Sequence, residues 1–208
     1  MKIDWGKYIK EYGVPSIAKE KILKPFFDKD FDAPILDLGC GKGYFSHLLA
    51  KRGLRVVGVD LNATLDNQKN FTFIQSDLLD FSTKEKFKTI FLINVLSTIT
   101  TGKHIAIFKK IKEFLDDKKG RAIVLNMNFL LYERDFKSSY LQVRKIEDEL
   151  GELDFTLVDG SHRFIRDFIL NEDEIIEVSK KAGLRLLERT QLGVKNDMPI
   201  YNIYTFES

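Results

Sequence analysis

Apolar residues recur along this chain as short continuous runs separated by amphipathic stretches. The runs lie at 34–38, 55–60, 71–75, 89–93 and 122–127. Short, nearly continuous apolar runs are typical of strands buried on both faces, as in a parallel sheet covered by helices. Helical patterns follow three of these runs, at 44–52, near 63–69 and at 102–116. This alternation predicts an α/β fold whose parallel strands are joined by helical crossovers.

The last part of the chain has a different pattern. Asn171 and Glu174 have the spacing of a capping box, so they predict the start of a helix that ends at Gly183. The β-prone runs 184–192 and 200–206 are joined by too few residues for a parallel crossover, so they should pair antiparallel. The predicted architecture is a Rossmann-like seven-stranded sheet, mostly parallel, with a C-terminal antiparallel hairpin and helices on both faces.

Two further segments are expected to flank the site of a single domain that spans residues 1–208. Residues 1–30 have an amphipathic pattern and are expected to form an N-terminal helical lid. Residues 128–170, after the fifth strand, are expected to form an inserted cap, with a helix over 139–150 followed by a hairpin with an Asp-Gly turn.

Composition restricts the kind of protein. The chain has 208 residues, a formal net charge of +2 and 44% hydrophobic residues, which is ordinary for one soluble domain. No run approaches the ~18 apolar residues of a membrane span, and the N-terminus lacks a signal-peptide core, so we expect a cytoplasmic protein. The lone Cys40 cannot form an internal disulfide. The three histidines, His47, His104 and His162, lack the spacing of metal ligands, so no metal is expected.

The segment from Ile35 to Phe45 carries the clearest chemical signal. An apolar run containing Asp37 leads into glycines at 39, 41 and 43, and a helical pattern follows. Such a strand-to-helix turn lets a ligand approach the backbone closely. The dinucleotide fingerprint requires a third glycine where this chain has Tyr44, which disfavours a pyrophosphate ligand.

The sequence Asp-Leu-Gly-Cys-Gly-Lys-Gly at 37–43 resembles motif I of the class I S-adenosylmethionine (SAM)-dependent methyltransferases. The resemblance implies SAM as the cofactor. It also implies that Asp37 and the loop with Gly39, Cys40 and Gly41 hold its methionine end.

Acids at the ends of the next two strands fit the same interpretation. Asp60 lies about 17 residues after Gly43, near the ~20 at which an acid binds ribose hydroxyls in related folds. By resemblance, Asp60 binds the ribose and Leu61 and Asn62 flank the adenine. Further members of the predicted cofactor site are Asp77, Leu78 and Asn94. Both aspartates could instead serve as ordinary helix caps.

The methyl acceptor is less well indicated. Many small-molecule members of the family place a histidine after the fourth strand, where this chain has Ser97 and Thr98. Transfer from a sulfonium can depend chiefly on alignment and desolvation, so a missing base does not argue against activity. The candidate catalytic residues are Tyr8, Tyr12, His162, Arg163 and Arg166. Additional candidates for facing the substrate are Asn126, Asn128 and Tyr132.

The favoured hypothesis is an enzyme that methylates an oxygen or nitrogen of a small molecule, because the chain lacks an appended nucleic-acid or protein-binding domain. A non-catalytic SAM-binding scaffold protein remains an alternative. An RNA methyltransferase is a second alternative, but the N-terminal lysines are interleaved with Asp4, Glu11 and Glu20 and do not form a phosphate-binding patch.

Overall fold

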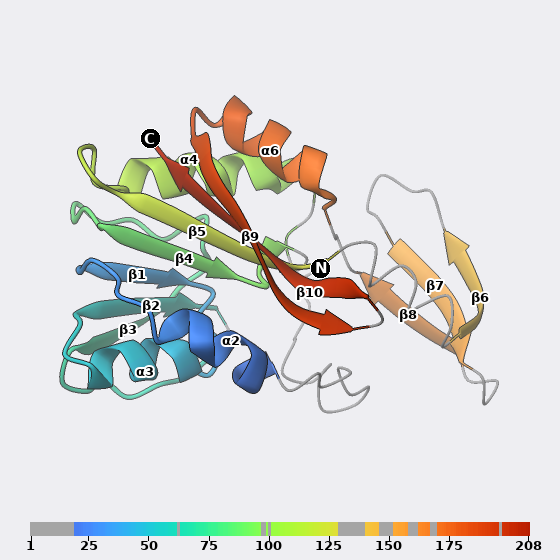
Figure 1. Cartoon of the computed structure of the whole chain (residues 1–208), viewed down its shortest axis with the longest axis horizontal. Coiled ribbons are helices and arrows are strands. Elements are labelled where there is room, and N and C mark those ends of the chain that lie inside the picture. Colours follow the sequence, from blue (N-terminus) through green and yellow to red (C-terminus); the bar gives the residue numbers. More distant parts are fainter. Residues whose placement is uncertain are drawn as a thin grey trace.

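The computed structural model describes residues 19–61, 63–96, 99, 101–128, 140–145, 152–157, 162–166, 170–195 and 197–208. One seven-stranded sheet forms its centre, with the strand order β3-β2-β1-β4-β5-β10-β9 (Figure 1). The parallel strands are β1 (Ile35–Leu38), β2 (Val56–Asp60), β3 (Phe71–Gln75), β4 (Thr89–Ile93) and β5 (Arg121–Met127). The strands β9 (Arg185–Lys195) and β10 (Met198–Glu207) form an antiparallel hairpin, and β10 pairs antiparallel with β5. The predicted sheet is therefore confirmed.

Helices cover both faces of this sheet, as the sequence predicts (Figure 1). One face carries α2 (Lys19–Phe27) and α3 (Tyr44–Lys51). The other face carries α4 (His104–Phe114), which follows the short 3-10 helix η2 (Thr101–Lys103), and α6 (Glu172–Lys181).

Alternate residues of each central strand pack into two separate cores. Ile90 and Leu92 of β4 belong to the core beneath α4 and α6, whereas Phe91 belongs to the core beneath α2 and α3. In the second core the rings of Phe27 and Phe45 stack at 4.1 Å between centroids, which joins α2 to α3. Burial on both faces is the reason that these strands have nearly continuous apolar sequences.

The capping box at the start of α6 is confirmed. The Oδ1 atom of Asn171 accepts a hydrogen bond from the backbone N–H of Glu174 at 3.0 Å, and the N–H of Asn171 donates to Glu174 Oε2 at 2.7 Å. Gly183 follows the helix with a φ of 82°, so the chain turns there into β9.

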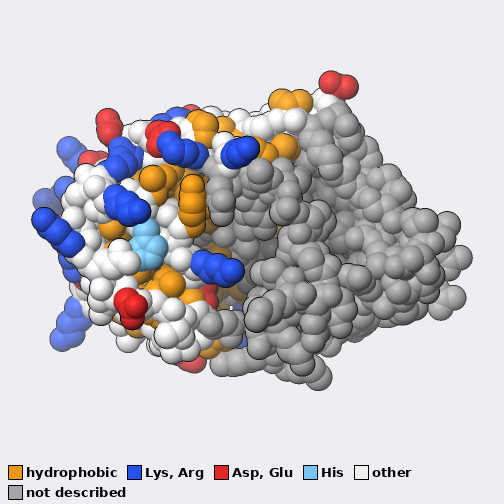
Figure 2. Space-filling model, turned by 90° about the horizontal axis from the view of Figure 1, so that it is seen from below, with side chains coloured by type: hydrophobic (Ala, Val, Ile, Leu, Met, Phe, Trp, Pro, Cys, Tyr) orange, Lys and Arg blue, Asp and Glu red, His pale blue; other side chains and the backbone are white. Residues whose placement is uncertain are grey.

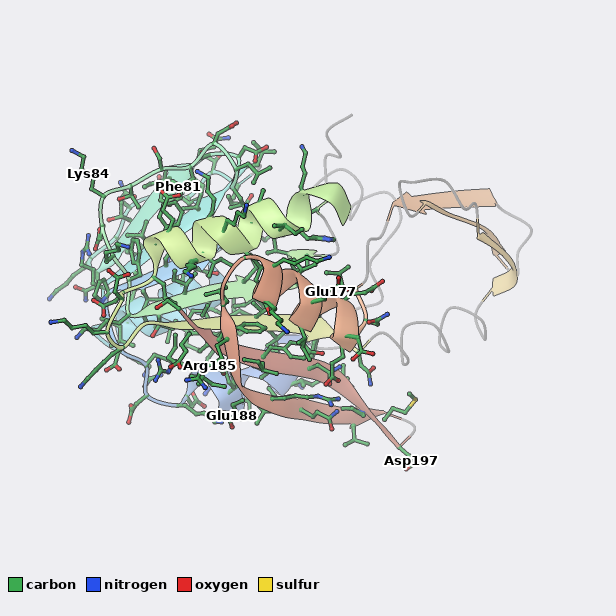
Figure 3. The ribbon with its side chains drawn as sticks, turned by 90° about the horizontal axis from the view of Figure 1, so that it is seen from above. Phe81, Lys84, Glu177, Arg185, Glu188 and Asp197 are labelled. Carbon is green, nitrogen blue, oxygen red and sulfur yellow. The ribbon has the colours of Figure 1, made fainter. Side chains whose placement is uncertain are left out.

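At the tip of the β9–β10 hairpin lies Asp197, with a φ of 63° (Figure 3).

A second, smaller sheet corrects one prediction for the inserted segment. Its antiparallel strands are β6 (Tyr140–Lys145), β7 (Glu152–Leu157) and β8 (His162–Arg166). The β7–β8 hairpin matches the predicted one, and its turn lies outside the described residues. The predicted helix over 139–150 is wrong for residues 140–145, which form β6, and the rest of that range lies outside the described residues. Pairing with β7, which sets Val143 opposite Phe155, outweighs the local helical preference.

The short helix predicted near 63–69 is also wrong. In its place the chain is irregular up to an isolated antiparallel bridge between Gln68 and Phe71. The side chain of Asn67 accepts a hydrogen bond from the backbone N–H of Phe73 at 2.7 Å, and Asn70 has a φ of 65°. Asparagine side chains that bond to the backbone in this way compete with helix formation.

The N-terminal lid is only partly within the described residues. Its C-terminal part is α2, so helix is confirmed over Lys19–Phe27, whereas residues 1–18 lie outside. The roles of residues 1–30 as a lid and 128–170 as a cap stay predictions. Across the described residues, none of the helices has the length and apolar character needed to cross a bilayer.

We predict that Asn171→Ala lowers the free energy of unfolding by about 1 kcal/mol, because the N–H of Glu174 loses its acceptor. Urea unfolding followed by circular dichroism measures this change. Asn171→Asp keeps a capping oxygen and is the matched control, which should remain within a few tenths of a kcal/mol of the wild type. Equal stability of all three proteins would show that the capping box does not stabilise α6.

Candidate cofactor and acceptor site

The loop between β1 and α3 is a tight turn of three left-handed glycines. Gly39, Gly41 and Gly43 have φ values of 76°, 55° and 70°. The backbone N–H of Gly39 donates to the carbonyl of Val59 at 2.7 Å, which ties the loop to the end of β2. A Cβ on Gly39 would lie 2.4 Å from Cγ2 of Val95, so the segment after β4 closes over this position.

Gly41 differs from its neighbours because nothing packs against it. A Cβ built there would meet no atom within 4 Å. Its N–H donates to Oδ2 of Asp60 at 2.9 Å, so the loop is held across the edge of the sheet by the acid that ends β2. The open space above Gly41 leaves room for a ligand to lie directly on the backbone.

Asp37 is a buried acid at the carboxyl end of β1. It is 3% exposed, and its Oδ2 accepts a hydrogen bond from the Ser46 hydroxyl at 2.5 Å. Its Oδ1 is buried and has no hydrogen-bond partner among the described residues. Burial raises the pKa of Asp37 to about 6; the Ser46 hydrogen bond opposes this shift, and the charge of Asp60 adds to it. An unpaired buried acceptor of this kind suits a cationic ligand group.

Asp60 binds the backbone of two loops. In addition to the N–H of Gly41, its carboxylate accepts the N–H of Ala63 on Oδ1 at 3.0 Å. The carbonyl of Asp60 accepts the N–H of Ser76 at 3.0 Å, which brings the end of β3 alongside the end of β2. The carbonyl of Leu61 accepts a hydrogen bond from Gln75 Nε2 at 3.2 Å, and Asn62 lies outside the described residues.

Asp77 shapes the loop after β3. Its Oδ1 accepts the N–H of Leu79 at 3.0 Å, and its carbonyl accepts the N–H groups of Asp80 and Phe81. This is the turn-capping role that the sequence leaves open for Asp77. Leu78 is partly buried against the core under α4.

The end of β4 brings Asn94 next to β10. Asn94 has a φ of 54°, and its N–H donates to the carbonyl of Leu125 at 2.7 Å. Burial raises the pKa of Tyr201 to about 12, and the nearby side chain of Asn94 opposes the shift. The buried Tyr201 hydroxyl nevertheless makes no hydrogen bond of ordinary geometry with a described residue.

Cys40 lies inside the loop but does not suit covalent chemistry. Burial raises the pKa of its thiol, and the charges of Asp37 and Asp60 raise it further. The thiol therefore stays protonated at neutral pH, whereas a cysteine nucleophile must be a thiolate. Within the described part of the chain, no group of His, Cys, Asp or Glu side chains is arranged to hold a metal ion.

The carboxyl ends of β1, β2 and β3 thus meet at an edge with an open glycine loop and a carboxylate oxygen of Asp37 that has no partner among the described residues. Residues 35–118, which contain all of the site residues described above except Tyr201 and Leu125, match the family model described as a methyltransferase domain. The chain carries a methyltransferase domain. This match supports the predicted methyltransferase family over residues 35–118, and the fold agrees with it.

Solved structures share the fold of this methyltransferase over nearly its whole length. A protein from Pyrococcus horikoshii OT3, PH0226, has a TM-score of 0.68 and 19% identity, and the alignment covers 96% of this chain and 93% of that one. The CcbJ methyltransferase from Streptomyces caelestis has a TM-score of 0.63 and 17% identity, with 97% and 95% covered. The glycopeptide N-methyltransferase MtfA, solved with S-adenosylhomocysteine, has a TM-score of 0.64 and 14% identity, with 88% and 84% covered. No curated protein matches the chain.

The predicted substrate-facing residues are less well placed by the structure. Tyr8, Tyr12 and Tyr132 lie outside the described residues, as do Ser97 and Thr98. The other catalytic candidates, which are His162, Arg163 and Arg166, lie on β8, whose backbone alone is described. Their catalytic roles stay predictions.

The two asparagines near the end of β5 are buried. The Nδ2 atom of Asn128 donates to the carbonyl of Pro199 at 2.8 Å, so this side chain joins β5 to β10. Oδ1 of Asn126 has no hydrogen-bond partner among the described residues. Asn126 pairs with Asn202 across the strands and therefore lies on the α4 and α6 face of the sheet.

The sequence analysis missed two residues of this site. Ser46 contacts Asp37 from the inner face of α3, and its signal is a small hydroxyl residue nine positions after the acid. The second is Tyr201 of β10, whose phenol lies near Asn94, and only its polar tip within a β-prone run distinguishes it.

We predict that Asp37→Asn stabilises the ligand-free methyltransferase at pH 8. The pKa of Asp37 is about 6 in the folded protein, above its ordinary 3.8, so the folded state binds a proton more tightly than the unfolded chain. The stability from this proton is complete below pH ~4 and is lost as the pH rises through about 6, at a cost of up to about 3 kcal/mol.

Urea unfolding at pH 5, 6, 7 and 8 checks this prediction. The advantage of Asp37→Asn should grow with pH, whereas Asp66→Asn, at an exposed acid of the neighbouring loop, should show no such trend. A variant that is less stable than the wild type at pH 8 would contradict the prediction.

Proposed function

We propose that this protein transfers a methyl group from SAM to an oxygen or nitrogen of a small-molecule acceptor. The observation that carries the proposal is the open backbone at Gly41, which lies between an unpaired oxygen of Asp37 and the carboxylate of Asp60. SAM offers an ammonium group and a ribose diol at the corresponding ends, so its groups complement these two acids.

Different residues of this edge bind different parts of the cofactor. Asp37 accepts a hydrogen bond from the ammonium group, and the backbone of the Gly39–Gly43 loop supports the methionine moiety. Asp60 accepts the ribose hydroxyls and Leu61 flanks the adenine, a role that is also expected of Asn62, which lies outside the described residues. Asp77 and the N–H of Leu78 lie at the adenine edge. The bound cofactor supplies a methyl group that is already activated by its sulfonium.

The chain's own contribution to the transfer is alignment and exclusion of water. Holding two reactants in line accelerates such a displacement without a covalent enzyme intermediate. The neutral Cys40 thiol and the protonated Tyr201 phenol fit this type of catalysis, because neither is poised as a nucleophile or base at neutral pH.

Surface charge supports a small-molecule acceptor over RNA. Figure 2 views the molecule from the side of α2 and α3, and the lysines and arginines of the described part are scattered over this face with a few acids among them. RNA-binding enzymes concentrate basic side chains around the site. The near-balanced net charge of +2 is consistent with this assignment.

Calorimetry and turnover assays test the proposed function together. Titration with SAM and S-adenosylhomocysteine measures binding, and release of labelled methyl product is then followed with small amines, alcohols, amino acids and hydroxy acids. Tight binding without any turnover would favour a SAM-binding scaffold protein. Salt-sensitive RNA binding with methylation of RNA would favour the RNA methyltransferase.

We predict that Gly41→Ala weakens SAM binding at least tenfold. The added methyl group would occupy the open space that the ligand uses, although it meets no protein atom within 4 Å. Gly53→Ala is a matched control, because Gly53 also has a positive φ, of 88°, and nothing within 4 Å. Both variants should lose about 1 kcal/mol of stability, but only Gly41→Ala should change the dissociation constant measured by calorimetry.

We also predict that Asp60→Ala weakens SAM binding by about 1–3 kcal/mol, because a charged acceptor is removed from the ribose hydroxyls and from the N–H of Gly41. Asp66→Ala removes an exposed acid from the same loop and should leave the affinity unchanged. Calorimetry on folded variants measures both. Unchanged affinity in Asp60→Ala would contradict the ribose assignment.

A further inference from the structure

We infer that Tyr201 selects the methyl acceptor by donating a hydrogen bond to a carbonyl or carboxylate oxygen beside the reacting atom. This inference rests on the proposed function, since it concerns the acceptor side of the same site. The inference assigns a substrate class to the enzyme, namely small molecules that carry such an oxygen next to the nucleophile. It also assigns a positioning role to a residue of β10.

The strand register places Tyr201 at the edge of the sheet where the cofactor loop lies. Leu38, Leu92, Val124 and Tyr204 form one row across β1, β4, β5 and β10. Tyr201 lies three residues beyond that row, in the direction of the carboxyl end of β5. It is therefore level with the glycine loop that follows Leu38 and not with the middle of the sheet.

Tyr201 also lies on the appropriate face. It belongs to the core beneath α2 and α3. Asp37 faces the same side, as its hydrogen bond to Ser46 of α3 shows. Strands β4 and β5 lie between β1 and β10, and the left-handed Asn94 at the end of β4 approaches the phenol. The phenol thus lies on the same face as the unpaired oxygen of Asp37, beyond Asn94.

The hydroxyl has no role in the fold that the described contacts reveal. The Tyr201 side chain is 0% exposed, and its hydroxyl makes no hydrogen bond of ordinary geometry with a described residue, although the side chain of Asn94 lies near enough to oppose the rise of its pKa. Burying a hydroxyl without a partner destabilises a protein by about 1–3 kcal/mol, and a phenylalanine would fill the same volume without that penalty. A partner that arrives with the substrate accounts for the polar tip at this position.

The chemistry of a phenol determines what this partner can be. With its pKa raised to about 12, Tyr201 keeps its proton at neutral pH and acts as a donor. Donation to the nucleophile itself would engage the lone pair that attacks the methyl group. Donation to a neighbouring oxygen leaves that lone pair free and orients the acceptor, and a site built for such an oxygen discriminates against analogues that lack it.

Tyr204 offers a matched control on the same strand. Its side chain is 1% exposed, and its pKa is also raised to about 12 by burial. It lies on the opposite face, in the core beneath α4 and α6, where Asn202, Glu172 and Arg189 influence its hydroxyl. Removing either hydroxyl is the same chemical change, but only Tyr201 lies on the face of the sheet that carries Asp37.

The experiment compares wild type, Tyr201→Phe and Tyr204→Phe with matched acceptors. Each amino acid or hydroxy acid is assayed beside the amine or alcohol that lacks its carboxylate. Wild type should prefer the carboxylate-bearing member of at least one pair. Tyr201→Phe should lower kcat/KM for that member by about tenfold or more, mainly through KM, and should leave its partner within about twofold. Tyr204→Phe should keep the preference of the wild type.

Two readouts without an acceptor separate this role from a structural one. Tyr201→Phe should have an unchanged Tm or one raised by about 2–4 °C, and its affinity for S-adenosylhomocysteine should equal that of the wild type. A lower Tm, a weaker affinity or an unchanged acceptor preference would each overturn the inference while the methyltransferase activity of the wild type stands. Absence of turnover by the wild type with every acceptor would instead overturn the proposed function, and this inference with it.

Discussion

The hydrogen bonds between the glycine loop and the end of β2 are the constraint on which the site depends. Gly39 is tied to the Val59 carbonyl and Gly41 to the Asp60 carboxylate, so the loop folds back over the edge of the sheet. Val95 packs so closely against Gly39 that no side chain fits there. At Gly41 the space beside the backbone stays open. A backbone surface is thereby presented to the ligand without loss of packing beneath it.

This arrangement buries polar groups that lower the stability of the ligand-free protein. Burial raises the pKa of Asp37 to about 6, and one of its oxygens lacks a partner among the described residues. Functional sites commonly retain such destabilised groups because a ligand compensates them. Tyr201 follows the same principle with a neutral group, since its hydroxyl is buried without a partner on the same face. Under the proposed function, Asp37 lies on the cofactor side of this edge and Tyr201 on the acceptor side.

Whether a prediction was correct depended on whether the structure at that position is set by local sequence or by contacts with other segments. The strands around Asp37, Asp60 and Asn94 were predictable because burial on both faces demands continuous apolar residues. The loop at 63–69 was not predictable, because the Asn67 side chain bonds to the backbone of a residue six positions later. The conformation of residues 140–145 was not predictable either, because it comes from pairing with β7. Local preference is weak compared with such pairing.

The sequence by itself determined the sheet, the glycine loop and the acids that end successive strands, because these depend on local periodicity and on glycine's access to positive φ. Those features were sufficient for the family and its cofactor. Only the tertiary structure decided which polar atoms lack partners and which residues share a face. Tyr201 is separated from Asn94 by more than a hundred residues, and only the antiparallel pairing of β10 with β5 brings them together. Contacts between such distant segments are set by packing of the whole chain, which no local pattern encodes.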